Sequence, residues 1–165
     1  MDKGFTYNNL LQISPKISSY KESFVRTIIN AKFFLPMNRF SSRMILEGHF
    51  GDIAISNIQG ITPNFRFYAG GIGNLLGYPY FSQGPKVNNK IIGGKFLATG
   101  LAGIKQCIHG NFSTMLYYNS GNASNKIDFS DVNILQAITI GFSCQSLLGS
   151  LMILVSKILT SGYKT

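Results

Sequence analysis

Apolar and polar residues alternate along much of the chain, a pattern that predicts β-strands with two unlike faces. The clearest stretch is 40–50, where Leu46 and Phe50 alternate with Glu47 and His49. Alternating or short apolar stretches bounded by Gly, Pro, Asn and Ser predict strands over 5–14, 25–33, 40–50, 96–107, 112–119, 135–144 and 151–158. The sequence therefore predicts an all-β, antiparallel fold of about seven strands.

The period of two gives each strand an apolar and a polar face, and two environments fit that division. In a soluble sandwich the apolar face meets a protein core, whereas in an outer-membrane barrel it meets lipid and the polar face lines the lumen. Periodicity does not separate the two. Turns are predicted at 35–38, 119–122 and 149–150, because Pro, Asn, Gly and Ser gather there.

The stretch 51–92 shows no strand pattern and contains several prolines and seven glycines. Connections of this length are unusual in a compact domain and are usually functional. Its aromatic residues need burial, and we therefore expect this loop to pack on the concave face of the sheet. They are Phe65, Phe67, Tyr68, Tyr78 and Tyr80.

The stretch 134–156 carries no formal charge and is long enough for a transmembrane helix. Polar and small residues interrupt it, and 147–150 is typical of a hairpin turn between two strands of about ten residues. We prefer two strands and keep the helix as an alternative. With the helix, the chain would be a small membrane-associated structural or interaction protein.

Composition excludes several functions. Charged residues make up 13% of the chain and the net charge is +9, but the Lys and Arg residues are scattered and match no nucleic-acid motif. Cys107 and Cys144 have no metal-ligand spacing around them, and the six acidic residues form no acid/base pair. The sequence predicts no enzyme activity, no cofactor, no metal and no nucleic-acid partner.

The glycine-rich stretches 65–80 and 92–100 resemble the long loop of the outer-membrane protein assembly factors, the bacterial surface antigen family of BamA and TamA. The sharpest matches are Gly70-Gly71, Gly77-Tyr78 and Gly93-Gly94. The resemblance implies that residues 1–165 form one partial β-barrel domain without a POTRA domain. The match corresponds to about the ninth to fifteenth strands of a sixteen-strand transmembrane barrel, with 51–92 as a luminal loop. The TamA-like subgroup is the most similar.

The resemblance also implies a site. The loop motif would be Gly70, Gly71, Leu76, Gly77 and Tyr78, and the barrel wall that receives it would include Gly103 and Asn119. In the family an Arg stands at the position of Leu76 and pairs with acidic residues of the barrel wall at the positions of Gly103 and Asn119. All three positions carry neutral residues here. Their joint loss of charge is physically consistent, because a lone buried charge is costly. We expect the loop to be held weakly or by apolar contacts.

The function implied by the resemblance is assembly or translocation of outer-membrane proteins, in a degenerate or incomplete form. The implied partners are outer-membrane lipid, unfolded client proteins and a TamB-like inner-membrane protein. The implied location is the bacterial outer membrane. Met1 to Phe5 lack the build of a signal peptide, so we expect the chain to be part of a longer precursor or not to be exported.

Overall fold

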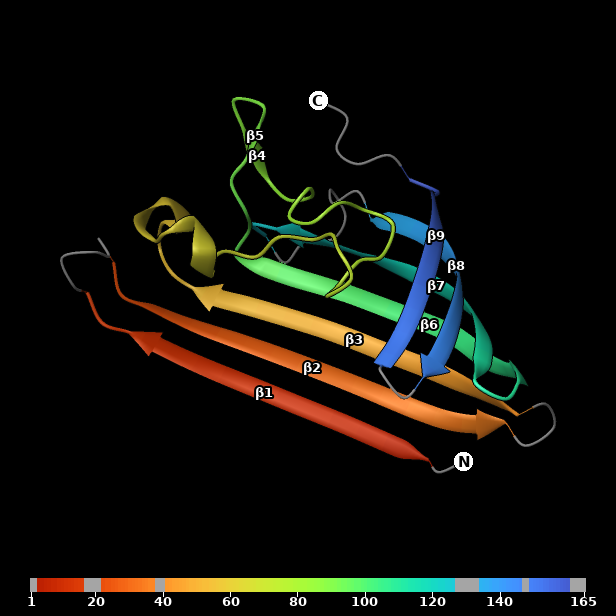
Figure 1. Ribbon diagram of the computed structural model, residues 1–165. Coiled ribbons are helices and arrows are strands. Elements are labelled where there is room, and N and C mark those ends of the chain that lie inside the picture. The colour runs from red at the N-terminus through yellow and green to blue at the C-terminus, as the bar shows by residue number, and fades with distance from the viewer. Residues whose placement is uncertain (1–2, 17–21, 38–40, 127–133, 147–148, 161–165) are drawn as a thin grey trace.

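The chain folds into one curved antiparallel sheet, seen in a computed structural model that describes residues 3–16, 22–37, 41–126, 134–146 and 149–160 (Figure 1). Its seven strands are β1 (Gly4–Ser14), β2 (Phe24–Met37), β3 (Ser42–Ala54), β6 (Phe96–His109), β7 (Phe112–Ser124), β8 (Leu135–Ser146) and β9 (Gly149–Ile158). They pair in the order β1-β2-β3-β6-β7-β8-β9. The prediction of an all-β antiparallel fold of about seven strands is confirmed.

Sequential neighbours pair throughout, and one long loop separates β3 from β6. The loop contains two short 3₁₀ helices, η1 (Ile58–Gly60) and η2 (Pro63–Phe65), and a small hairpin of β4 (Lys86–Val87) and β5 (Lys90–Ile91). Figure 1 shows the loop above the concave side of the sheet, with β8 and β9 curling up beside it. The loop therefore packs where the sequence predicted.

Three boundaries differ from the prediction. The residues 35–37 of the first predicted turn continue β2, and the second predicted turn, 119–122, lies inside β7. Each of these segments has ladder partners: Met37 pairs with Ser42, and Asn119 pairs with both Leu101 and Ala137. Cross-strand pairing outweighs local turn preference here. The loop begins after Ala54, because β3 extends beyond residue 51. The third predicted turn lies partly outside the described residues.

The helix considered for 134–156 is wrong, because this stretch forms β8 and β9. Its polar residues fit a sheet: Thr139 is fully buried and its hydroxyl lies 2.8 Å from the Ser156 hydroxyl on the paired strand. Among the described residues, no helix has both the length and the apolar character needed to cross a membrane.

The convex, outer face of the sheet is apolar. Register places a row of hydrophobic residues side by side across six strands: Leu35, Met44, Ile104, Leu116, Ile140 and Val155. Five of the six are exposed, from 41% for Leu35 to 72% for Val155. An exposed apolar surface of this extent is typical of a face that contacts lipid or another protein. The concave, inner face is mixed, with Lys32, Glu47, His49 and Asn119 among its residues.

The hydrophobic core lies between the inner face and the loop. Half of its residues come from the strands and half from the loop: Phe24, Ile53, Leu97, Ala123, Leu135 and Ala137, and Ile58, Ile61, Phe67, Ala69, Leu75 and Tyr78. The loop is therefore a structural layer, because a single sheet cannot bury its own face.

Replacing Leu75 by Ala tests this role of the loop. Leu75 is fully buried, so the change should lower the free energy of unfolding by about 2–5 kcal/mol. Ile72, three residues away and 64% exposed, supplies the control Ile72→Ala, which should change stability little. Urea unfolding of both variants in detergent micelles measures the difference. Equal stabilities would mean that the loop does not form the core.

Candidate functional site: a loop docked on the inner face

An aromatic ring of the loop packs directly on a glycine of β3 and fixes the loop to the sheet. A side chain on Gly51 would collide with the ring of Phe67, so this ring lies directly on β3. The Arg26 guanidinium, from β2, lies 4.8 Å from the centroid of the same ring. The backbone of Phe67 also pairs with Gly94 through two hydrogen bonds of 3.0 and 2.8 Å. Two strands and the end of the loop therefore hold one aromatic residue.

Two cations tie the loop to itself by donating to backbone carbonyls. Arg66 donates to the carbonyls of Ile61 and Ile92, at 2.8 and 2.9 Å. Lys95 donates to the carbonyls of Ile55 and Ser56, at 2.6 and 3.1 Å. Charged donors form stronger hydrogen bonds than neutral ones. These bonds join the ascending and descending parts of the loop.

The predicted motif residues Gly70 and Gly71 form a tight bend with φ angles of +117° and +95°. A side chain on Gly70 would meet the Pro79 carbonyl oxygen, and one on Gly71 would meet the Tyr80 ring, so only Gly fits at both positions. Asn74 closes the bend: its Oδ1 accepts from the Gly70 N–H and its Nδ2 donates to the Tyr68 carbonyl, both at 2.9 Å.

The tip of the loop rests on the last two strands of the sheet. Leu76 is buried, and Gly77 has a φ angle of +94°. A Cβ atom added to Gly77 would lie 3.0 Å from the Cβ of Ala137 and 3.1 Å from the Cβ of Ser156. Gly77 therefore lets the loop approach the backbones of β8 and β9.

Tyr78 locks the tip with its hydroxyl. The oxygen accepts from the Gln136 N–H at 3.2 Å, and the hydroxyl proton is within reach of the carbonyls of Thr160, at 2.6 Å, and Gln136, at 3.1 Å. Burial raises the pKa of the Tyr78 phenol above its ordinary value. Apolar contact alone does not hold this loop, contrary to the sequence-based expectation.

The two predicted wall residues have different surroundings. Asn119 is fully buried, pairs with Ala137 beneath the loop tip, and donates from Nδ2 to the Ala137 carbonyl at 3.3 Å. Gly103 pairs with Tyr117, two ladder positions from the pair of Leu101 and Asn119, and the Tyr117 ring covers it on the inner face. Asn119 thus lies next to a strand that the loop tip contacts, whereas Gly103 lies under an aromatic side chain of the wall. Their role as a loop receptor stays a prediction.

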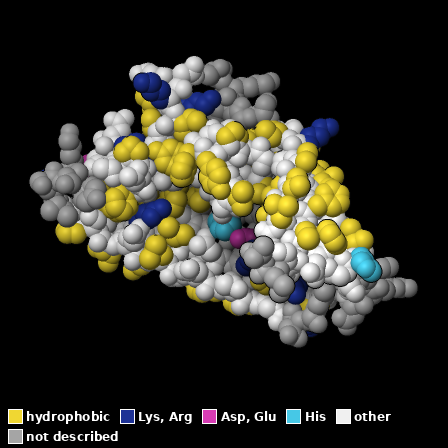
Figure 2. Space-filling model, in the orientation of Figure 1, with side chains coloured by type: hydrophobic (Ala, Val, Ile, Leu, Met, Phe, Trp, Pro, Cys, Tyr) yellow, Lys and Arg dark blue, Asp and Glu magenta, His cyan; other side chains and the backbone are white. Residues whose placement is uncertain are grey.

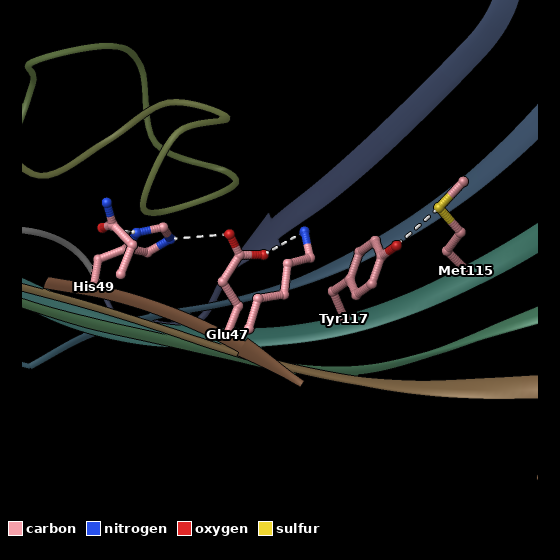
Figure 3. Close-up of polar contacts among 6 residues, drawn as sticks. Glu47, His49, Met115 and Tyr117 are labelled. Carbon is pink, nitrogen blue, oxygen red and sulfur yellow. Dashed lines mark hydrogen bonds and ion pairs between the residues drawn. The ribbon is translucent and has the colours of Figure 1, made fainter. Parts of the chain in front are cut away.

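An ionic network occupies the inner face beside this wall (Figure 3). Glu47 accepts from the Lys32 ammonium at 2.9 Å and lies 3.3 Å from His49 Nε2, while His49 Nδ1 lies 2.8 Å from Asn30 Oδ1. On the same face, Tyr117 donates to the sulfur of Met115 at 3.0 Å. Glu47 is in the inner-face row that continues to Asn119. Glu47 therefore has its partners, Lys32 and His49, on β2 and β3, and not on the loop.

Comparison with known proteins agrees with this geometry. Residues 5–143 match the model of the Omp85 superfamily domain. The chain belongs to the Omp85 superfamily. Its fold is similar to the crystal structure of BamA from Haemophilus ducreyi lacking POTRA domains 1–3, with a TM-score of 0.77 and 17% sequence identity. The match covers 96% of this chain and 35% of that one, so the chain spans about a third of that structure's length.

Sequence reasoning missed several residues that hold the loop of this Omp85 chain. Arg26, Arg66 and Asn74 act through contacts with backbone or with a distant ring, and no local pattern marks them. The spacing of Gly51 and Phe67 gives no signal either, although an unexplained Gly in a strand indicates a close approach. Tyr80 was expected to be buried but is 63% exposed, because it lies beyond the lock at Tyr78.

Removing the Tyr78 hydroxyl tests the lock. In Tyr78→Phe, the Gln136 N–H and the Thr160 carbonyl lose their partner while the ring stays, so we expect a loss of about 1–3 kcal/mol. Hydrogen exchange at loop and β8 amides, together with the thermal midpoint in detergent, measures the effect. Tyr80→Phe is the matched control, and identical behaviour of the two variants would argue against the lock.

Proposed function

We propose that this chain forms a wall sector and the luminal loop of an outer-membrane barrel that assists insertion or translocation of β-barrel or autotransporter proteins. The observation that carries the proposal is a loop locked onto the inner face of a sheet, where polar groups lie beside the core, while the outer face is apolar. An apolar belt outside and polar groups inside are what a transmembrane barrel requires. The Omp85 family membership supports the same conclusion.

The sheet needs further strands to work in a bilayer. Among the described residues, β1 and β9 each pair on one side only, so their other edges present free N–H and C=O groups. In hydrocarbon each unsatisfied group costs several kcal/mol. With antiparallel neighbours throughout, β1 and β9 run in the same direction. A complementary sheet that closes the barrel with antiparallel pairs only must therefore contain an odd number of strands. Two copies of this sheet inserted in the same orientation would instead bring β9 of one copy beside β1 of the other in parallel.

Within the superfamily we propose a TamA-like role, supported by the loop motif. Outer-membrane lipid would contact the outer face, unfolded client proteins would be the substrates, and a TamB-like protein of the inner membrane would be a further partner. The mechanism involves no covalent chemistry: an edge strand templates an incoming strand through backbone hydrogen bonds. The neutral tip residue Leu76 and the neutral wall residues Gly103 and Asn119 support an activity lower than that of a barrel with the full ionic set.

A pair of substitutions tests whether the outer face contacts lipid. Tyr7 and Leu10 lie near the middle of β1 and are similarly exposed, at 54% and 46%. The register places Tyr7 on the outer face and Leu10 on the inner face. Tyr7→Arg should make the free energy of folding into lipid vesicles less favourable by about 2–4 kcal/mol. Leu10→Arg should change this free energy much less, because only the outer face meets hydrocarbon.

Gel mobility of folded and unfolded protein, after dilution from urea into vesicles together with a barrel segment that supplies the missing strands, measures this difference. In detergent-free buffer, where no lipid is present, the two variants should behave alike. Equal losses in vesicles would contradict a lipid-facing outer surface.

Assembly activity itself tests the proposed function. The chain reconstituted alone in liposomes should not accelerate insertion of an unfolded barrel protein, because its open edges are unsatisfied. Co-reconstitution with a barrel segment that supplies the missing strands should accelerate it. Tyr78→Phe should weaken this gain, whereas Tyr80→Phe should not. Strong acceleration by the chain alone would refute the sector model, and no acceleration by the complemented barrel would refute the proposed function.

A further inference from the structure

A pocket is formed entirely by loop residues, and none of the residues described above as contacts between loop tip and wall lines it. It has a volume of about 570 Å³ and is lined by Pro63, Asn64, Arg66, Tyr68, Phe81 and Ile91. This is within the size range of pockets that hold small ligands or a large side chain. All of its residues belong to the loop, so the core and the Tyr78 lock do not use it.

The rings of Tyr68 and Phe81 form an aromatic wall of this pocket, 5.4 Å apart and nearly perpendicular. Tyr68 is held in place by a hydrogen bond from its hydroxyl to the Ile92 carbonyl at 3.2 Å. Phe81 is 66% exposed and has a left-handed backbone with φ +54°, which is uncommon for a bulky residue. An exposed ring held in an unfavourable backbone conformation indicates a binding role.

Arg66 places a positive charge in the same pocket. Its two terminal nitrogens donate to carbonyls, and its Nε atom is buried without a hydrogen-bond partner. Among the described side chains no carboxylate lies within ion-pair distance of Arg66; the ion pairs there are those of Glu47. A partly buried cation without a counter-charge favours an anionic ligand.

Other charged residues of the loop are also basic. Between Asp52 and Asp128 the sequence contains no acidic residue, whereas the loop carries Lys86, Lys90 and Lys95 besides Arg66. Figure 2 shows Lys and Arg side chains around the upper part of the molecule, where Figure 1 places the β4–β5 hairpin. Glu22 also reaches the loop, where its carboxylate accepts from the Asn57 N–H, but the loop's own charged residues are all basic, and this excess favours negatively charged partners.

We infer that this pocket binds an acidic polypeptide segment that presents an aromatic side chain, with the aromatic ring against Tyr68 and Phe81 and a carboxylate near Arg66. Aromatic anchors in pockets with a neighbouring charge are a common form of peptide recognition. A polypeptide fits better than lipid, because the loop lies on the concave side of the sheet and the apolar outer face is on the other side. The choice of a polypeptide as the ligand rests on the proposed function, in which unfolded proteins are the substrates.

Fluorescence anisotropy with labelled peptides tests the inference on the full chain refolded in detergent micelles. The probe is Ser-Gly-Asp-Phe-Asp-Gly-Ser, compared with one version in which Asn replaces both Asp residues and one in which Ala replaces Phe. Each change should weaken binding about tenfold, as the loss of one anchor contact does. Three peptides that bind equally well, or do not bind, would overturn the inference.

A matched pair of protein variants locates the binding. Phe81→Asn removes the ring, and Asn tolerates the left-handed backbone, so the fold should persist while peptide affinity falls about tenfold. Ile72→Asn changes an equally exposed residue of the same loop, 64% against 66%, outside the pocket, and should leave affinity unchanged. Equal affinity of both variants would overturn the assignment. If Phe81→Asn does not refold, the peptide series with the unaltered chain decides.

Vesicles of phosphatidylglycerol test the lipid alternative. If Phe81→Asn reduced vesicle binding more than Ile72→Asn did, the pocket would be a site for lipid phosphate and the inference would be wrong. Peptide binding requires no assembly activity, so its failure can be told apart from a failure of the complemented barrel in the liposome assay.

Discussion

A single curved sheet with an apolar outer face has no interior, and the packing of the long loop on the inner face makes up for this. Phe67 on Gly51 and the buried Leu75 and Tyr78 cover the sheet with a second layer. The buried core of the described chain depends on this contact between loop and strands. Loops usually contribute little to a core; here loop residues supply half of it, so a change in loop docking is a change in stability.

The inner face combines this core with polar groups that satisfy one another. Glu47 is paired with Lys32 and His49 from the neighbouring positions of β2 and β3. The loop tip then needs no charge: Leu76 is buried, and the tip contacts the wall through Gly77 and the Tyr78 hydroxyl. A neutral tip over a wall with balanced charge avoids the cost of an unpaired buried ion. Hydrogen bonds to backbone carbonyls hold it with defined geometry.

Both free edges of the sheet point to a larger barrel. β1 and β9 run in the same direction, and each has one unpaired side among the described residues. An apolar surface such as the row from Leu35 to Val155 requires lipid or protein beside it. Membership in the Omp85 superfamily and the fold's similarity to a BamA crystal structure agree with both features.

The sequence by itself determined the strands and their faces. Side chains alternate with a period of two whatever the strand's neighbours are, so Leu46 and Phe50 could be assigned to one face and Glu47 and His49 to the other. The same reasoning found the loop, and the family resemblance marked Gly70, Gly71 and Gly77. Local patterns failed where partners decide the outcome: residues 35–37 and 119–122 have turn composition but are paired in the ladder. Likewise, an uncharged stretch fits a helix or two strands until its neighbours are known.

Only the tertiary structure decided how the loop is held. The Tyr78 hydroxyl meets Gln136 and Thr160, 58 and 82 residues away in the chain, and Phe67 meets Arg26 and Gly51 on two different strands. Such contacts leave no periodic signal, because they join single residues across long separations and use backbone groups that every residue has. Whether Tyr78 is buried and Tyr80 exposed depends on where the loop tip lies, and its contacts with Ala137, Ser156 and Gln136 on β8 and β9 set that position.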